Sequence, residues 1–188
     1  MTRLGALVSA LVLSVLAACS GDGLGSVIEA ARQASQGSEG SSMRLTSSAF
    51  EPGADIPRRF TCDGRDISPR LALHDIPAGA RSLVLVMDDP DAPGGTWDHW
   101  VAYDIPVGDV IEEGVGRLGV AGRNSWGRTG YGGPCPPRGT HRYVFAVYAL
   151  DTSLGLPAGA EKANVLQAIE GHVLAEARLM GRYARSGG

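Results

Sequence analysis

Acidic, histidine and aromatic side chains gather in a short stretch of the sequence that is interrupted by prolines. Residues 88–100 read DDPDAPGGTWDHW and follow an apolar run. Proline fixes φ and removes a backbone donor, so the chain must leave its strand here in a stiff turn. Such a turn would present Asp89, Asp91 and His99 from a rigid loop, beside two tryptophans. We interpret these three as part of a site, although aspartates in a turn could serve only to cap it, the role we expect for Asp98.

A second stretch, residues 130–143, joins glycines and prolines to a histidine and two tyrosines. It reads GYGGPCPPRGTHRY. Glycines let backbone N–H groups approach a ligand closely, and prolines hold the loop still. His141 and Tyr143 are two positions apart, so on a strand they point to the same side. A lone histidine is more often a structural hydrogen-bonding residue, but a histidine and a tyrosine on one face beside such a loop are candidates to bind a ligand.

Catalysis is the main alternative to binding. The chain contains neither the G-x-S-x-G elbow of acyl-transfer enzymes nor the G-K-[ST] of a P-loop. A metal-dependent hydrolase is conceivable, because two histidines with carboxylates can hold a metal ion. The residues for it would be Asp89, Asp91, His99 and His141. Their spacing matches no ligand motif, so we expect no metal, no other cofactor and no catalytic residue, and binding is favoured.

The composition is that of a globular protein of one domain's length. The chain has 188 residues, of which 44% are hydrophobic and 20% charged. Its formal net charge is -3, and Lys162 is the single lysine beside sixteen arginines. Because this balance offers no basic face to neutralise phosphates, we expect no nucleic-acid partner.

The N-terminus has the pattern of an export signal. Arg3 is the only charge in residues 1–18, and the apolar run after it is too short for a membrane span of about twenty residues. The run ends in Leu-Ala-Ala-Cys, with the cysteine at position 19. Small residues before a cysteine are similar to the lipobox of bacterial lipoproteins, in which Cys19 would be acylated and the chain cut just before it. An ordinary signal peptide with an incidental cysteine is the alternative.

A lipid on Cys19 would anchor the protein to the cell membrane, facing the extracytoplasmic side. Without residues 1–18, sixteen basic residues remain against twenty acidic ones, so acyl chains rather than a polybasic patch would hold the protein there. Residues 19–42 are rich in glycine and serine and are interpreted as a flexible tether.

Apolar runs alternate with glycine and proline through residues 43–185, which we expect to form one domain. The run 143–150 is apolar on both faces, which is typical of a central, buried strand. At 162–180, apolar residues recur every three or four positions, the spacing of one helix face, although Gly171 weakens this prediction. The sequence therefore predicts a mainly β domain with a C-terminal amphipathic helix. The expected strands are residues 45–50, 71–74, 82–88, 100–105 and 142–150.

Several of these motifs together resemble the phosphatidylethanolamine-binding protein (PEBP) family. They are DPDAP followed by W-x-H-W, then GYGGPCPP-x-G-x-H-R-Y and YALD, to which FTCDGRDISP at 60–69 and IPAG at 76–79 are added. More narrowly, they are similar to the bacterial branch described as Raf-kinase-inhibitor-like, over residues 44–183. The resemblance implies a large antiparallel β-sheet packed on a smaller one, with a C-terminal helix.

The resemblance also implies a pocket that binds phosphate-like anions and phospholipid head groups. Histidine and tyrosine would donate hydrogen bonds to the ligand, backbone N–H groups of the glycine-rich loop would add more, and a carboxylate would orient a histidine. Such a carboxylate would repel a phosphate unless a protonated histidine or a ligand ammonium group paired with it. Carried over to this sequence, the pocket would be formed by Asp89, Asp91, Trp97, His99, Tyr131, Pro134, His141 and Tyr143.

Two further expectations follow from the resemblance and from export. Cys62 and Cys135 both lie inside matched motifs, and disulfides persist outside the cytoplasm, so we expect them to pair. Two unrelated small apolar residues are the alternative. Some members of the family regulate kinases or proteases, so an inhibitor of a protease or of another envelope protein is a second candidate function.

Overall fold

The computed structural model describes residues 42–185, and these fold into two antiparallel β-sheets. The predictions for the signal peptide, Cys19 and nearly all of the tether therefore lie outside the described residues. A short 3₁₀ helix, η1 (Arg58–Phe60), precedes the smaller sheet's second strand, and one α-helix, α2 (Lys162–Ala168), precedes the last strand. The smaller sheet has the order β1 (Arg44–Ser47), β2 (Leu71–His74) and β5 (Val110–Ile111). The larger sheet has the order β6 (Val120–Ala121), β4 (Trp97–Ile105), β3 (Ser82–Asp89), β7 (Thr140–Leu150) and β8 (Val173–Ala184).

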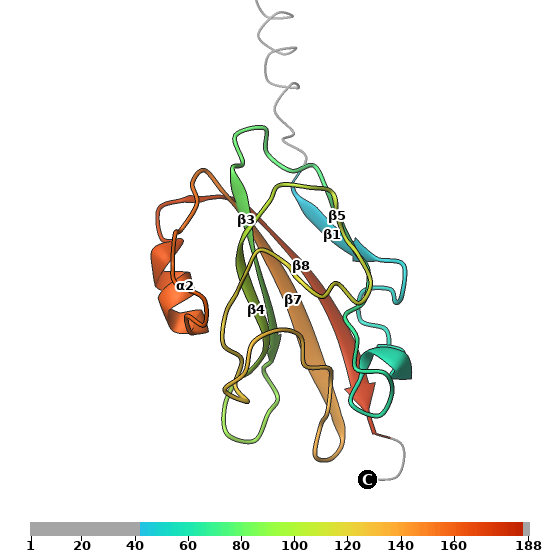
Figure 1. Ribbon diagram of the computed structural model, residues 1–188. Coiled ribbons are helices and arrows are strands. Elements are labelled where there is room, and N and C mark those ends of the chain that lie inside the picture. Colours follow the sequence, from blue (N-terminus) through green and yellow to red (C-terminus); the bar gives the residue numbers. More distant parts are fainter. Residues whose placement is uncertain (1–41, 186–188) are drawn as a thin grey trace, which may run out of the picture. The chain divides into compact units, whose positions relative to one another are not determined.

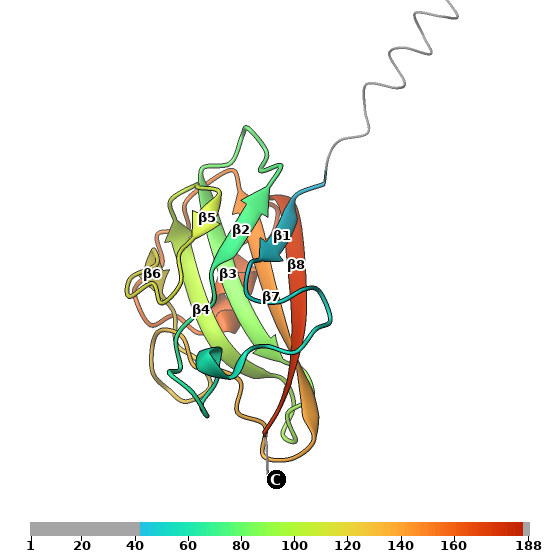
Figure 2. The same cartoon turned by 90° about the vertical axis from the view of Figure 1, so that its right-hand side faces the viewer.

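The larger sheet is covered on both faces, which explains its long apolar strands. Figure 1 shows the smaller sheet on one side of it and α2 on the other, and Figure 2 shows the smaller sheet in front. Along β3, Leu85 and Met87 join the core between the two sheets, whereas Val84 and Val86 pack toward α2. The fold predicted from the sequence, a large antiparallel sheet packed on a smaller one, is confirmed. The expected buried strand 143–150 is also present, as the main part of β7.

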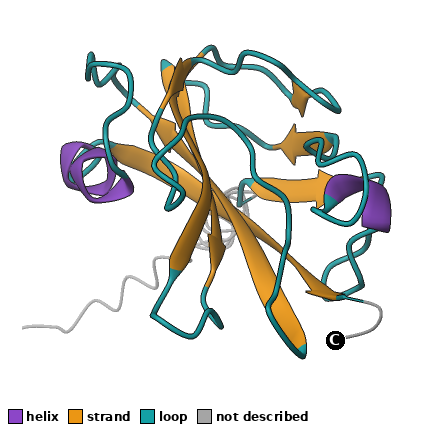
Figure 3. Ribbon diagram, turned by 60° about the horizontal axis from the view of Figure 1, so that its bottom comes forward, coloured by secondary structure: helices purple, strands orange, loops and turns teal. Residues whose placement is uncertain are grey.

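The predicted C-terminal helix is much shorter than the residue pattern indicated. The helix ends at Ala168, and Gly171, with a φ of 80°, turns the chain into the strand β8. Within β8, alternate residues Ala177, Leu179 and Tyr183 are buried, so the side-chain period is two. The prediction of a helix through residue 180 was wrong, because pairing with β7 along nearly the whole strand overrides a local helical spacing. Figure 3 shows α2 and the short η1 on either side of the crossing strands.

The lone lysine holds the helix onto the larger sheet. The Lys162 ammonium forms ion pairs with the carboxylates of Asp88, at 2.9 Å, and Asp98. Burial raises the pKa of Asp88, and the hydrogen bond from Lys162 opposes that rise. Asp98, which we expected to cap a turn, lies instead within β4 and is one of the two partners of Lys162.

Candidate functional site

A small cavity lies where three neighbouring strands of the larger sheet end or begin. Asp89 closes β3, Trp97 opens β4, and the loop before β7 completes the wall. The cavity has a volume of about 230 Å³. It is lined by Asp89, Ala92, Pro93, Trp97, His99, Trp126, Cys135 and Pro137. The two stretches singled out from the sequence, 88–100 and 130–143, thus meet at one place.

A β-bulge in β4 aims His99 at this cavity. Met87 of β3 pairs with Trp100, but the next residue pairs with Asp98, so His99 is the extra residue between them. A bulge shifts the alternation of side chains by one position. Trp97 and His99 therefore face the cavity, while Asp98 turns to the opposite face of the sheet and meets the helix.

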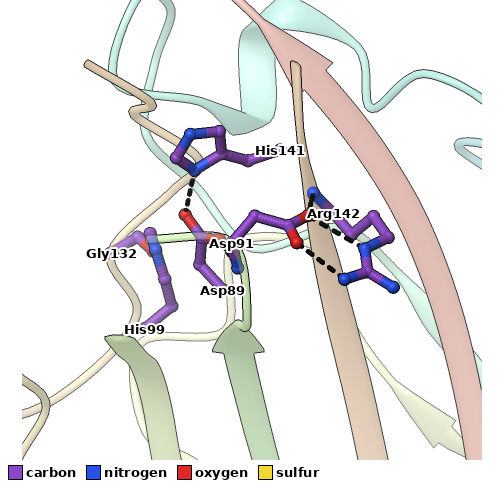
Figure 4. Close-up of polar contacts among 6 residues, drawn as sticks. All are labelled: Asp89, Asp91, His99, Gly132, His141 and Arg142. Atoms are coloured by element: carbon purple, nitrogen blue, oxygen red, sulfur yellow. Dashed lines mark hydrogen bonds and ion pairs between the residues drawn. The ribbon is translucent and has the colours of Figure 1, made fainter. Parts of the chain in front are cut away.

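A buried hydrogen bond joins Asp89 to His141. The distance from His141 Nδ1 to Asp89 Oδ2 is 2.7 Å, and both residues are less than 10% exposed. The other carboxylate oxygen, Oδ1, accepts the backbone N–H of Asp91 at 2.9 Å (Figure 4). Because Nδ1 donates to the carboxylate, Nδ1 carries the proton of a neutral His141 ring. Its Nε2 then has a lone pair and can only accept a hydrogen bond.

His99 is held by the backbone of the glycine-rich loop. Its Nδ1 lies 2.7 Å from the Gly132 carbonyl oxygen, which can only accept, so Nδ1 carries the proton (Figure 4). Burial lowers the pKa of His99 below its usual value of 6.5. At neutral pH the ring is therefore uncharged, and Nε2 carries a lone pair. The rings of Trp126 and Tyr143 stand edge-on to it, with centroids 4.8 and 5.2 Å away.

The Tyr143 hydroxyl is the unusual polar group of the site. The side chain is fully buried, and its oxygen has no hydrogen-bond partner of normal geometry in the described structure. Its polar neighbours are the Asp89 carboxylate and the Cys135 backbone. Burial, and then the charge of Asp89, raises the pKa of Tyr143. The hydroxyl thus stays protonated and remains able to donate a hydrogen bond.

Comparison with known proteins establishes the family. The sequence model of the phosphatidylethanolamine-binding protein family matches residues 46–184. The chain belongs to this family. A UPF0098 protein of Methanothermobacter thermautotrophicus is 52% identical over 150 residues, covering 76% of this chain and 99% of that relative. Another, from Aquifex aeolicus, is 48% identical over 155 residues, which are 78% of this chain and 91% of that relative.

Solved structures agree with this membership. The crystal structure of a putative PEBP homologue from Chlamydia trachomatis, CT736, superposes with a TM-score of 0.75 at 43% identity, covering 77% of this chain and 99% of that one. The structure of Escherichia coli YbcL, described as a member of the mammalian PEBP family, gives a TM-score of 0.72 at 30% identity. It covers 78% of this chain and all of YbcL.

Five of the eight residues that the PEBP resemblance assigned to the pocket do not line the cavity. Two of them, His141 and Tyr143, lie behind its wall, against Asp89 and His99. The other three are held by contacts elsewhere. The Asp91 carboxylate accepts hydrogen bonds from the backbone and guanidinium of Arg142, which hold its pKa at about 2 (Figure 4). The Tyr131 hydroxyl donates to the Phe60 carbonyl at 2.6 Å. The Pro134 carbonyl accepts the backbone N–H of Cys62. Their contacts brace the loops around the cavity rather than line it.

The glycine-rich loop does not offer the backbone donors that the sequence suggested. The Gly132 N–H donates to the His99 carbonyl at 3.1 Å, and the Gly133 N–H donates to the Asp66 carboxylate at 2.6 Å. Both groups are already satisfied inside the protein. These two groups are therefore not free to bind a ligand.

Four lining residues were not predicted as part of the site: Ala92, Pro93, Pro137 and, the largest of them, Trp126. Trp126 lies in a turn whose backbone N–H groups donate to the Asn124 side chain. Its ring covers Gly132 so closely that an added Cβ there would come within 2.6 Å of it. With Trp97, whose ring centroid is 5.4 Å away, it forms an exposed aromatic corner at the rim. Trp126 stands outside both stretches; a lone tryptophan in a Gly/Ser-rich turn was the only signal.

A disulfide joins the wall of the cavity to the segment that follows η1, and the pairing is the one we expected. Cys62 and Cys135 are bonded, with their Cα atoms 5.4 Å apart. Because Cys135 lines the cavity, the bond fixes one wall of it to the turn that follows η1.

Within residues 42–185, no three His, Cys, Asp or Glu side chains come together as ligands for a metal ion. No helix in the same range is long and apolar enough to cross a membrane.

Proposed function

We propose that the cavity of this PEBP-family protein binds a small phosphate-bearing head group. The buried Tyr143 hydroxyl is the observation that supports this best. Tyr143 does not line the cavity itself but lies behind the lining residue His99. Leaving its buried hydroxyl without a partner costs about 1–3 kcal/mol, which a ligand oxygen that reaches it past His99 would recover. His99 Nε2 lies on the neighbouring ring and becomes a second donor when it takes up a proton.

The charges around the cavity favour a ligand that carries an amine as well as a phosphate. No lysine or arginine is among the lining residues, and Asp89 supplies a carboxylate. Trp97 and Trp126 offer ring faces, which attract an ammonium group. We therefore expect a zwitterionic head group, with its phosphate toward His99 and Tyr143 and its ammonium group toward Asp89 and the tryptophans.

Calorimetry with phosphoethanolamine tests this proposal. Phosphoethanolamine should bind more tightly than inorganic phosphate or ethanolamine alone. His99→Ala should weaken its binding by about 1.5–3 kcal/mol, the scale of a hydrogen bond to a charged group. His172→Ala is the control, because His172 is exposed and pairs with Asp151. Equal affinities in the wild type and His99→Ala would reject the site.

We also propose that the protein is an exported lipoprotein anchored to the cell membrane through Cys19, and that it belongs to the Raf-kinase-inhibitor-like branch. The motifs given above support both. Cys19→Ala should yield an unprocessed or soluble protein, whereas the wild type should carry an acyl mass on Cys19. Ser20→Ala serves as the control for a neighbouring change. Mass spectrometry that finds an unmodified mature N-terminus at another residue in the wild type would contradict the anchor.

A further inference from the structure

A second, larger hollow also borders the glycine-rich loop, through Gly130 and Tyr131. Its volume is about 510 Å³, within the range of small-molecule sites. Most of its lining is apolar: Val115, Leu118, Val120, Trp100 and Tyr131. It shares no lining residue with the head-group cavity.

The floor of this hollow is rigid. The rings of Trp100 and Tyr131 stand edge to face with centroids 5.5 Å apart, and the Tyr131 hydroxyl is fixed on the Phe60 carbonyl. The loop that forms the outer wall is fixed as well. Gly119, at a φ of 53°, lies so close to β4 that an added Cβ would come within 2.4 Å of the Tyr103 carbonyl oxygen. The hollow is therefore formed before any ligand arrives.

One charge stands at the wall of this apolar hollow. Arg117 is exposed and forms no ion pair with any residue of the range 42–185. The two acidic residues nearest to it in the loop are already paired, since Glu112 pairs with Arg70 and Glu113 with Arg59. The guanidinium is thus available to an anion from outside.

The geometry points to a second binding site, for an amphiphile with an aliphatic body and a carboxylate. The aliphatic body lies against Trp100, Leu118 and Val120, and the carboxylate pairs with Arg117. A guanidinium presents a planar set of donors that fits a carboxylate. This site is independent of the head-group cavity and stands whether or not phosphoethanolamine binds there.

Octanoate and its neutral analogue octanol are the probes, titrated into the full-length protein by calorimetry below their aggregation concentrations. Gly116 lines the hollow, and nothing lies within 4 Å of a Cβ added there. Gly116→Phe therefore adds a ring at the wall of the hollow without a clash. Gly94→Phe is the matched control, because Gly94 has equal free space but lines neither this hollow nor the one that adjoins it. Arg117→Gln removes only the charge, at an exposed position, and keeps the test valid should Gly116→Phe fail to fold.

Octanoate should bind the wild type at one site and bind Gly116→Phe at least about tenfold more weakly, with Gly94→Phe unchanged. Arg117→Gln should lose about tenfold for octanoate and nothing for octanol, since the latter has no charge to pair. Absence of saturable octanoate binding to the wild type would overturn the proposal. So would full affinity in folded Gly116→Phe, or octanol binding as tightly as octanoate.

Discussion

Replacing Cys62 and Cys135 together by serine is expected to lower the free energy of unfolding by about 4 kcal/mol. The disulfide closes a loop across a sequence separation of 73 residues. In the chain-entropy model, a loop of that length removes conformations from the unfolded chain worth about 4 kcal/mol. Denaturant unfolding of the double variant and the wild type measures the difference.

The same measurement on the wild type with and without reductant is the control for this prediction. Reduction should reproduce the loss without any change of sequence, while the double variant should no longer respond to reductant. A loss below about 1 kcal/mol would show that the unfolded chain gains little freedom when the bond is absent. The bond would then serve mainly to hold Cys135 in the cavity wall.

Asp89→Ala should destabilise the protein by about 3–5 kcal/mol. Removing one partner of a buried, hydrogen-bonded pair leaves the other desolvated and unpaired. Asp89 is 4% exposed and His141 is 7% exposed. The variant also leaves the Asp91 N–H without its acceptor. Chemical denaturation at neutral pH gives the change in the free energy of unfolding.

The chain contains a matched control for this pair. His172 and Asp151 form the same kind of contact at 2.9 Å, but both side chains are about half exposed. Asp151→Ala should cost less than about 1 kcal/mol, because exposed pairs contribute little. Equal losses in the two variants would mean that burial is not what makes the Asp89–His141 pair strong.

The sequence predicted the fold well because its strands carry strong local signals. The strand Leu71–His74 was predicted with its observed bounds, and β3 and β7 within two residues. The helix prediction through residue 180 failed because helical spacing and strand alternation can share the same apolar positions over a short range. Only the pairing of β8 with β7 decides between them, and that pairing is a long-range contact.

The cavity was predicted less completely, for two physical reasons. Alternation along a strand cannot foresee a bulge, and the bulge at His99 determines which of Trp97 and Asp98 faces the cavity. A carboxylate in a turn also cannot be assigned to a site from sequence alone. The Asp91 carboxylate pairs with the Arg142 guanidinium, whereas Asp89, two residues earlier, is buried and hydrogen-bonded to His141. Trp126 enters the site from a loop that no motif marked.

The protonation of His99 on ligand binding tests the head-group proposal most directly. Because burial lowers the pKa of free His99, its ring is neutral at pH 7, and a bound phosphate should raise that pKa. Binding is then coupled to proton uptake, so affinity should strengthen as the pH falls from 8 toward 6.5, where the ligand phosphate itself begins to protonate. His99 then has one pKa in the free protein and a higher one in the complex. At a pH above both, the affinity should no longer change with pH and should be at its weakest.

Nitrogen-15 NMR of the four histidine rings follows this change residue by residue. On adding phosphoethanolamine at pH 7, the His99 Nε2 signal should move from the position of a lone-pair nitrogen toward that of an N–H. His99 Nδ1 should keep its N–H, and the exposed His172 ring should not respond. An unchanged His99 Nε2 signal at saturating ligand would contradict the proposed function.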